Sequence, residues 1–188
     1  MTKNNTLDGT RSVQFEAPIQ AIDKWLIIQV PEEESVKLSS RGQLSVTGLL
    51  NGHEFLTVLE PDGRWSHWFK VDEKLQESLG VSAGSSVEVS LTQSSVWPEP
   101  TVPDDLAAAL DAAPQNIKEL WRAITPMARW EWVRWVNETR NADTRKRRVE
   151  VSISKMQSGK RRPCCFNLAA CTDPDLSRSG RLMEVLPS

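Results

Sequence analysis

The sequence contains no tyrosine, two histidines and three cysteines among its 188 residues. It also lacks the Gly-x-Ser-x-Gly, P-loop, Gly-x-Gly-x-x-Gly and Cys-x-x-Cys motifs that mark common enzyme classes. His53 and His67 both fall in or beside predicted strands, where a structural role is the simpler interpretation. Carboxylates are numerous, but their spacing singles out no catalytic pair. We therefore expect a protein that is not an enzyme and that uses no cofactor.

Long apolar runs are missing as well, since none approaches the roughly 18 residues that a membrane-spanning helix needs. The first nine residues lack the apolar core of a signal peptide. An apolar content of 39% and a charged content of 26% are ordinary for a soluble globular protein. These features predict a cytoplasmic protein without membrane insertion, long enough for one large domain or two small ones.

The three cysteines lie close together late in the chain, at Cys164, Cys165 and Cys171. Their odd number and the adjacent pair make a poor disulfide framework, so we expect reduced thiols. The cations at 160–162 would stabilise thiolates, and three thiolates can hold a soft metal ion. However, the spacing matches no standard zinc site. Buried structural cysteines are the favoured interpretation, and a thiol- or metal-binding protein stays an alternative.

Positive charge is concentrated in residues 139–162, where nine Lys/Arg face two carboxylates, although the whole chain has a net charge of −2. The nine cations are Arg140, Arg145, Lys146, Arg147, Arg148, Lys155, Lys160, Arg161 and Arg162. Such a segment forms either a solvated surface or a site for an anion or an acidic partner. A nucleic-acid-binding protein is therefore an alternative function, although an isoelectric point near 5.8 argues against a general nucleic-acid coat.

The first half of the chain has the alternating pattern of β-strands. Residues 12–30 alternate apolar and polar side chains, and Asn51-Gly52 separates two β-prone runs. Asn-Gly is a strong hairpin signal because a type I′ turn needs positive φ at both central residues. The three carboxylates at 32–34 predict a solvated loop, and a later strand would place Trp65 and Trp68 on opposite faces.

The last predicted element of this half is a short helix, capped by Asp72 and ended by Gly80, that leads into a strand. The segment Leu79-Gly80-Val81-x-x-Gly84-x-x-Val87-x-Val89 resembles the closing unit of AbrB/MazE-type swapped-hairpin folds. Over residues 12–92, the order of elements resembles a bacterial domain of unknown function. The resemblance implies a double-split β barrel, in which one chain is equivalent to an AbrB dimer. It does not extend to DNA binding, because residues 1–96 carry 8 Lys/Arg and 13 Asp/Glu.

The second half has helical periodicity. Four helices are predicted, over about 104–113, 115–123, 125–136 and 141–157, from proline and polar caps and from apolar spacing. The predicted divisions are a disordered N-terminus (1–11), a barrel domain (12–92), a proline-rich linker (93–103), a helical domain (104–158) and a basic, cysteine-containing tail (159–188). The fold class is therefore α+β, with an N-terminal double-split β barrel followed by a small C-terminal helical domain.

Eight tryptophans and four phenylalanines make up the aromatic residues. Core packing is the simpler interpretation, because an indole buries a large apolar area and needs one partner for its N–H group. The alternative is an exposed shelf that stacks a flat ligand, and one tryptophan of the third helix is expected to reach the barrel or a groove. The candidate residues for binding a ligand or anion are Trp130, Trp132, Trp135, Arg140, Arg145, Arg148, Lys160, Arg161 and Arg162.

A second resemblance lies in the helical half. Trp135-Val136, followed by Asp143-Thr144-Arg145-x-x-Arg148-Val149, resembles a signature of the YdeI/OmpD-associated family, and 159–167 resembles the ending of one branch of it. The family is associated by name with bacteriocin or antimicrobial-peptide protection and with envelope stress. The two-domain architecture, the surplus of tryptophan and this family association together favour a non-enzymatic protein that binds a peptide, protein or small ligand between barrel and helices. Because the expected barrel is a one-chain version of a dimeric fold, we expect a monomer or a weak homodimer.

Overall fold

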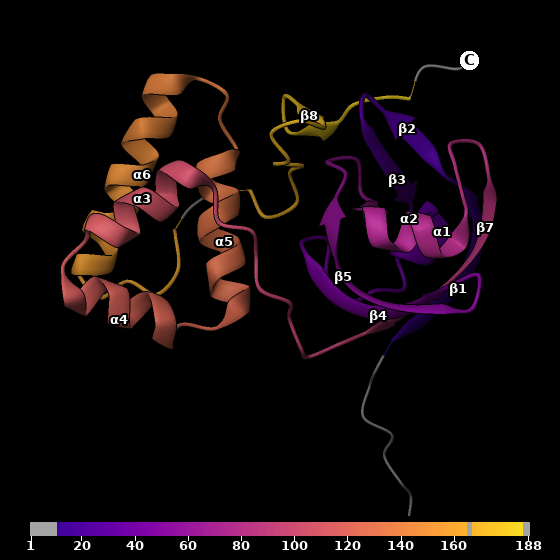
Figure 1. Cartoon of the computed structure of the whole chain (residues 1–188), viewed down its shortest axis with the longest axis horizontal. Helices are drawn as coiled ribbons and strands as arrows, with labels where there is room; N and C mark the ends of the chain where they lie inside the picture. The colour runs from indigo at the N-terminus through magenta and orange to yellow at the C-terminus, as the bar shows by residue number, and fades with distance from the viewer. Residues whose placement is uncertain (1–10, 165–166, 186–188) are drawn as a thin grey trace, which may run out of the picture. The chain divides into compact units, whose positions relative to one another are not determined.

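The computed structural model describes residues 11–164 and 167–185, and it has the predicted α+β class (Figure 1). The chain forms two compact units, residues 1–96 with 184–188 and residues 97–183, here named the sheet unit and the helical unit. The boundary falls within the segment predicted as a linker. Of the predicted disordered N-terminus, only Arg11 belongs to the described residues.

The sheet unit is one curled antiparallel sheet of seven strands in the order β1-β7-β4-β5-β6-β3-β2. Its elements are β1 (Ser12–Pro18), β2 (Gln20–Ile22), β3 (Trp25–Gln29), α1 (Glu32–Ser35), β4 (Leu44–Leu50), β5 (His53–Pro61), β6 (His67–Lys70), α2 (Glu73–Leu79) and β7 (Ser86–Gln93). The end strands β1 and β2 are separated only by Ile19, so the sheet curls back on itself. Its concave side encloses a core that includes Val46, Leu59 and Leu91.

The predicted hairpin and helix cap are both confirmed. Asn51 and Gly52 have φ of 46° and 84°, and they join β4 to β5 with Leu50 opposite His53. Asp72 accepts a hydrogen bond from the backbone N–H of Leu75 at 2.8 Å, and Gly80 ends α2 in the left-handed conformation.

Two predictions about this unit are wrong. Residues 32–35 form the short helix α1 rather than a loop, because the carbonyl of Pro31 accepts the N–H of Ser35 at 2.8 Å. Trp65 does not belong to a strand. The carboxylate of Asp62 accepts the N–H groups of Arg64 and Ser66, which holds a tight turn, and Trp65 sits in that turn with φ of 82° and 70% exposure.

The helical unit contains the four predicted helices and a small hairpin. The elements are α3 (Asp104–Ala112), α4 (Gln115–Ala123), α5 (Pro126–Asn137), α6 (Ala142–Gln157), β8 (Ser177–Arg178) and β9 (Arg181–Leu182). Thr125 and Asn141 cap α5 and α6 through their side chains. The helices enclose a second apolar core, to which α6 contributes Val149 and Met156.

The chain after α6 also packs into the helical unit. Arg134 of α5 is 3% exposed, and its guanidinium donates to the carbonyls of Leu168 and Ala170 and to the hydroxyl of Thr172. Cys171 is buried beside this contact, and its N–H donates to the carbonyl of Gly180 at 2.9 Å. The segment predicted as a basic tail is therefore fixed in place by a buried cation of α5.

Candidate functional site

Most of the predicted cationic site is engaged in contacts inside the helical unit. Arg145 forms two hydrogen bonds to Asp105, at 2.6 and 3.0 Å, and this contact lowers the pKa of Asp105. Arg148 donates to Glu138 at 2.6 Å. Arginine and carboxylate pair in this way across α3, α5 and α6, so these cations hold helices together.

Three further arginines of the predicted site also have internal partners. Arg162 pairs with Glu131 at 2.6 Å, while Arg140 and Arg161 donate to the carbonyls of Ser177 and Ala123. Within residues 11–164 and 167–185, the exposed cations of this segment with no partner side chain or carbonyl are Lys146, Arg147 and Lys160. Lys160 is thus the one predicted binding cation whose side chain faces solvent without such a partner.

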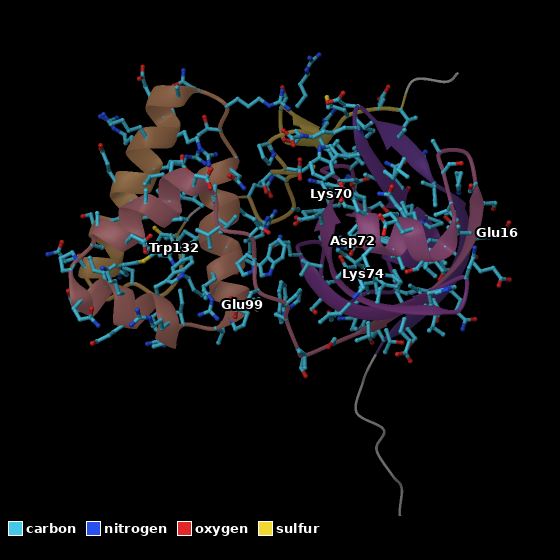
Figure 2. All side chains as sticks on the ribbon, in the orientation of Figure 1. Glu16, Lys70, Asp72, Lys74, Glu99 and Trp132 are labelled. Carbon is cyan, nitrogen blue, oxygen red and sulfur yellow. The ribbon has the colours of Figure 1, made fainter. Side chains whose placement is uncertain are left out.

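The predicted tryptophans do not form a shelf. Trp132 is fully buried and donates its indole N–H to the carbonyl of Arg161, which corrects its assignment as a lining residue (Figure 2). Trp130 is partly buried and donates to the carbonyl of Pro98. Trp135 lies edge-on to Trp132, and the cations of Arg148 and Lys155 lie 5.3 and 5.4 Å from its ring centre. Since cations cover the Trp135 ring, it offers little surface for stacking.

The cysteines divide between the surface and the core. Cys164 is exposed, and the ammonium of Lys155 lies 3.0 Å from its sulfur, whereas Cys171 is buried. Cys165 lies outside the described residues. Among the residues that the structure describes, no group of three or more His, Cys, Asp or Glu side chains is placed to hold a metal ion.

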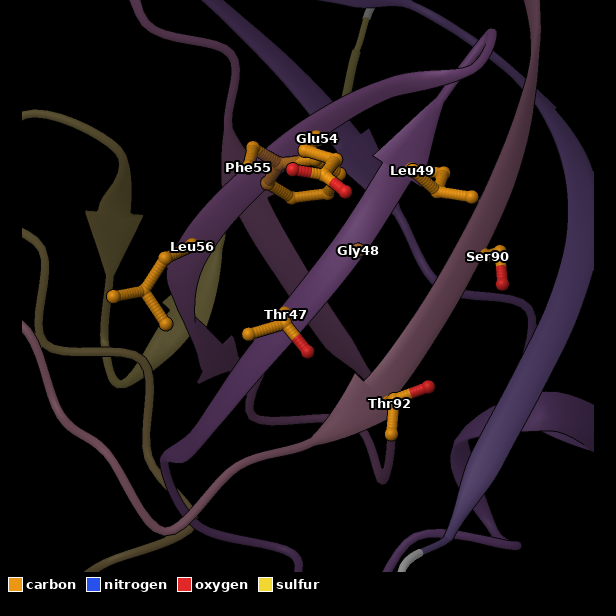
Figure 3. A pocket seen from close by; sticks show the side chains of 8 residues that line it. All are labelled: Thr47, Gly48, Leu49, Glu54, Phe55, Leu56, Ser90 and Thr92. Atoms are coloured by element: carbon orange, nitrogen blue, oxygen red, sulfur yellow. The ribbon is translucent and has the colours of Figure 1, made fainter.

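An unassigned concave surface lies on the outer side of the curled sheet. A hollow of about 520 Å³ covers β4, β5 and β7, with Leu49 beside Ser90 on neighbouring strands (Figure 3). Its lining residues are Thr47, Gly48, Leu49, Glu54, Phe55, Leu56, Ser90 and Thr92. Leu49 and Leu56 are 42% and 43% exposed, and the outward side chains two residues before them, Thr47 and Glu54, are polar.

A second hollow of about 480 Å³ adjoins the first, because both include Leu49 and Ser90. It is lined by Gln14, Phe15, Glu16, Leu49, Gly52, Glu88, Val89 and Ser90. Together the outward-facing members form one surface, here named the outer sheet face: Gln14, Glu16, Thr47, Leu49, Glu54, Leu56, Glu88, Ser90 and Thr92. Its lining residues include three carboxylates and no cation, so it combines exposed leucine with negative charge.

Strand geometry explains why these side chains share one face. Successive residues of a strand point to opposite sides, so Val46 and Leu50 enter the core while Thr47 and Leu49 face outward. Sequence reasoning missed this surface, because the alternation of one strand does not show which strands are neighbours. The available signal was Leu49 next to buried Leu50, two leucines that cannot both enter the core.

Each of the two units contains a region that matches a known protein family. A family described as "Bacteriocin-protection, YdeI or OmpD-Associated" matches residues 99–159. A family described as "Domain of unknown function (DUF1905)" matches residues 15–91. The helical unit therefore contains a region similar to the YdeI/OmpD-associated family, and the sheet unit contains a domain of unknown function. Comparison with curated proteins gives no match.

The two matched regions coincide with different structural features of the chain. The match at 99–159 contains α3 to α6 and the ion pairs of Arg145 with Asp105 and of Arg148 with Glu138. The match at 15–91 contains most of the outer sheet face, from Glu16 to Ser90. Across the described part of the chain, no helix has the length and apolar character needed to cross a bilayer.

His67, the buried histidine of the sheet unit, has a structural role. Its Nε2 lies 2.9 Å from the carbonyl of Gly42 and its Nδ1 lies 2.7 Å from the hydroxyl of Ser35. A neutral ring satisfies both contacts, since Nε2–H donates to the carbonyl and Nδ1 accepts from the hydroxyl. Burial lowers the pKa of His67 below its ordinary 6.5, because the charged ring would lose its solvation.

This burial predicts a pH dependence of stability. Below pH 6.5 His67 is protonated in the unfolded state but stays neutral in the folded state, because its folded pKa is lower. The free energy of unfolding therefore falls as the pH falls through 6.5 towards the folded pKa. Above 6.5 both states are neutral and the contribution is complete. The expected slope is at most about 1.4 kcal/mol per pH unit, measured by urea denaturation between pH 7.5 and 5. If the free energy of unfolding of the His67→Gln variant depends on pH in this range as steeply as that of the natural chain, His67 is not the titrating group.

Proposed function

We propose that this protein is a non-enzymatic binding protein of the cytoplasm that takes part in protection against antimicrobial peptides. We further propose that it holds a cationic amphipathic peptide on the outer sheet face. The family description supports the first part, because it names bacteriocin protection. The second part is supported by the exposed leucines of that face and by its carboxylates, which form no ion pair with the described residues.

The chemistry of the outer sheet face complements such a peptide. Leu49 and Leu56 expose apolar surface that a leucine-rich peptide face would remove from water, at about 25 cal/mol per Å². The carboxylates of Glu16, Glu54 and Glu88 surround this surface and attract lysine and arginine side chains. A neutral or anionic peptide would gain the apolar contact but not the electrostatic one.

A nucleic-acid ligand has less support. Five arginines of the cationic segment already bind partners within the helical unit, and Lys146, Arg147 and Lys160 are left facing solvent. Three phosphate contacts would give weak binding that salt largely removes. The sheet unit adds no compensating charge, because carboxylates outnumber cations over residues 1–96.

A titration with a labelled peptide tests the proposal. The probe is a fluorescein-labelled 20-residue peptide of lysine and leucine, added to the full chain at low salt and followed by fluorescence anisotropy. We expect saturable binding, and we expect Leu49→Ser with Leu56→Ser to weaken it by about 10- to 30-fold, since each leucine contributes about 1 kcal/mol.

Val36→Ser is the matched control, because Val36 is 49% exposed on the sheet unit but does not belong to the outer sheet face. Its affinity should equal that of the natural chain. If the double variant binds the peptide as tightly as the Val36→Ser control, the outer sheet face is not the binding surface. If the natural chain shows no saturable binding, the proposed function is refuted.

A further inference from the structure

The two edges of strand β5 differ in how much of their length pairs with a neighbouring strand. On one side it pairs with β4 along seven residues, from Leu44 opposite Leu59 to Leu50 opposite His53. On the other side it pairs with β6 only at Glu60 and Pro61. Within the described parts of the chain, the second edge of residues 53–59 has no strand beside it.

The register shows which backbone groups face this open edge. In a hairpin with a two-residue loop, the residues that flank the loop exchange backbone hydrogen bonds, and such pairs recur at every second residue. His53, Phe55 and Thr57 therefore bond to β4. The alternate residues Glu54, Leu56 and Val58 direct their N–H and C=O groups away from β4.

Two neighbouring contacts agree with this parity. The N–H of Asn51 donates to Glu88 of β7, so odd-numbered residues of this part of β4 face β7 and even-numbered ones face β5. Farther along β5, Glu60 faces β6, on the same side as Glu54 and Leu56. The open edge thus presents a row of unpaired donors and acceptors at a spacing that another strand can match.

The open edge lacks two of the residues that commonly protect a strand against strand addition. Proteins commonly place proline or lysine on such edges, and residues 53–59 contain neither. The exposed outward side chains there are Glu54 and Leu56, both members of the outer sheet face, while Val58 on the same side is 5% exposed. An added strand would bring its own side chains directly opposite them, one opposite the carboxylate and one opposite the leucine.

We propose that the open edge of β5 binds a cationic peptide in extended form, as an antiparallel strand added to the sheet. This inference rests on the proposed peptide-binding function and states its geometry. Backbone hydrogen bonds to Glu54, Leu56 and Val58 supply affinity that is independent of side chains. A lysine or arginine opposite Glu54 and an apolar residue opposite Leu56 select the peptide.

Charge favours a peptide over a second copy of the chain. Two copies joined at β5 would bring together two outer sheet faces, each with the carboxylates of Glu16, Glu54 and Glu88. A cationic strand neutralises this charge, whereas a second copy doubles it. The antiparallel direction follows the sheet itself, in which every neighbouring pair is antiparallel.

The test uses peptides with a blocked backbone, so the protein itself is not altered. The probe is the nine-residue peptide Thr-Lys-Thr-Leu-Thr-Lys-Thr-Leu-Thr, labelled at one end, whose lysines and leucines share one face when it is extended. In one isomer the backbone nitrogens of one lysine and one leucine are methylated. In the matched control the backbone nitrogens of two threonines are methylated instead. Antiparallel addition directs the lysine and leucine N–H groups at β5, so the first isomer should lose at least tenfold in affinity and the control should not.

The remaining outcomes separate this inference from the function on which it rests. Equal affinity of the two isomers, or binding of the 20-residue peptide but not of the unmethylated nine-residue one, would overturn strand addition and leave peptide binding intact. No binding of either peptide would overturn both. A reversible, concentration-dependent doubling of mass without peptide, abolished by the nine-residue peptide, would assign the edge to a second copy and refute the proposal.

Discussion

Replacing Trp132 by alanine is expected to lower the free energy of unfolding of the helical unit by about 3–5 kcal/mol. The indole is fully buried, so its removal leaves a cavity among α5 and its neighbours. The substitution also removes the donor that the carbonyl of Arg161 uses. Denaturant unfolding followed by circular dichroism at 222 nm measures the loss, because that signal reports mainly on helices.

Trp65→Ala is the control for this prediction. Trp65 is 70% exposed in a turn of the sheet unit, so its removal should change stability by no more than about 0.5 kcal/mol. A loss below about 1 kcal/mol for Trp132→Ala, together with weaker peptide binding, would contradict the assignment of Trp132 to the core. It would return Trp132 to the binding residues that the sequence suggested.

Replacing Arg134 by methionine is expected to cost about 3 kcal/mol and to release the segment that follows α6. Methionine keeps an unbranched apolar stem but donates no hydrogen bonds, so the carbonyls of Leu168 and Ala170 and the hydroxyl of Thr172 lose their donor. Each unsatisfied buried group costs about 1–3 kcal/mol, although solvent can reach some of them once the segment moves. Limited proteolysis should then cut within 167–183 before the rest of the chain.

Arg147→Met controls for the loss of one positive charge. Arg147 is exposed on α6 and has no partner among the described residues, so its substitution should alter neither the denaturation midpoint nor the cleavage pattern. Equal protease resistance of the Arg134 and Arg147 variants would show that Arg134 does not fix the segment.

The helices and the hairpin could be predicted because their signals are local. Thr125 and Asn141 cap their helices through hydrogen bonds to N–H groups three residues ahead. The Asn51-Gly52 turn likewise depends on the conformations of those two residues alone. The wrong prediction of a strand at Trp65 also has a local cause. The carboxylate of Asp62 accepts the N–H groups of Arg64 and Ser66 and so holds these residues in a turn.

The candidate site could not be predicted because its determinants are distant in sequence. Arg145 resembles an anion-binding residue until its partner Asp105, 40 positions earlier, is known. Likewise, Leu49 and Ser90 lie side by side only because β4 pairs with β7, which composition and periodicity do not encode. The cluster of cations therefore predicted a binding site, whereas in the fold most of these cations form ion pairs and hydrogen bonds. The acidic outer sheet face was not predicted.

Hydrogen exchange of the full chain, with and without the 20-residue lysine and leucine peptide, tests the location of the peptide most directly. The proposed function predicts slower exchange in 47–58 and 88–92, with the helical unit unchanged. The open edge of β5 should gain the most protection, since no strand among the described residues pairs with the N–H groups of Glu54, Leu56 and Val58. Protection confined to 99–159 would contradict the account and place the ligand on the helices of the family match instead.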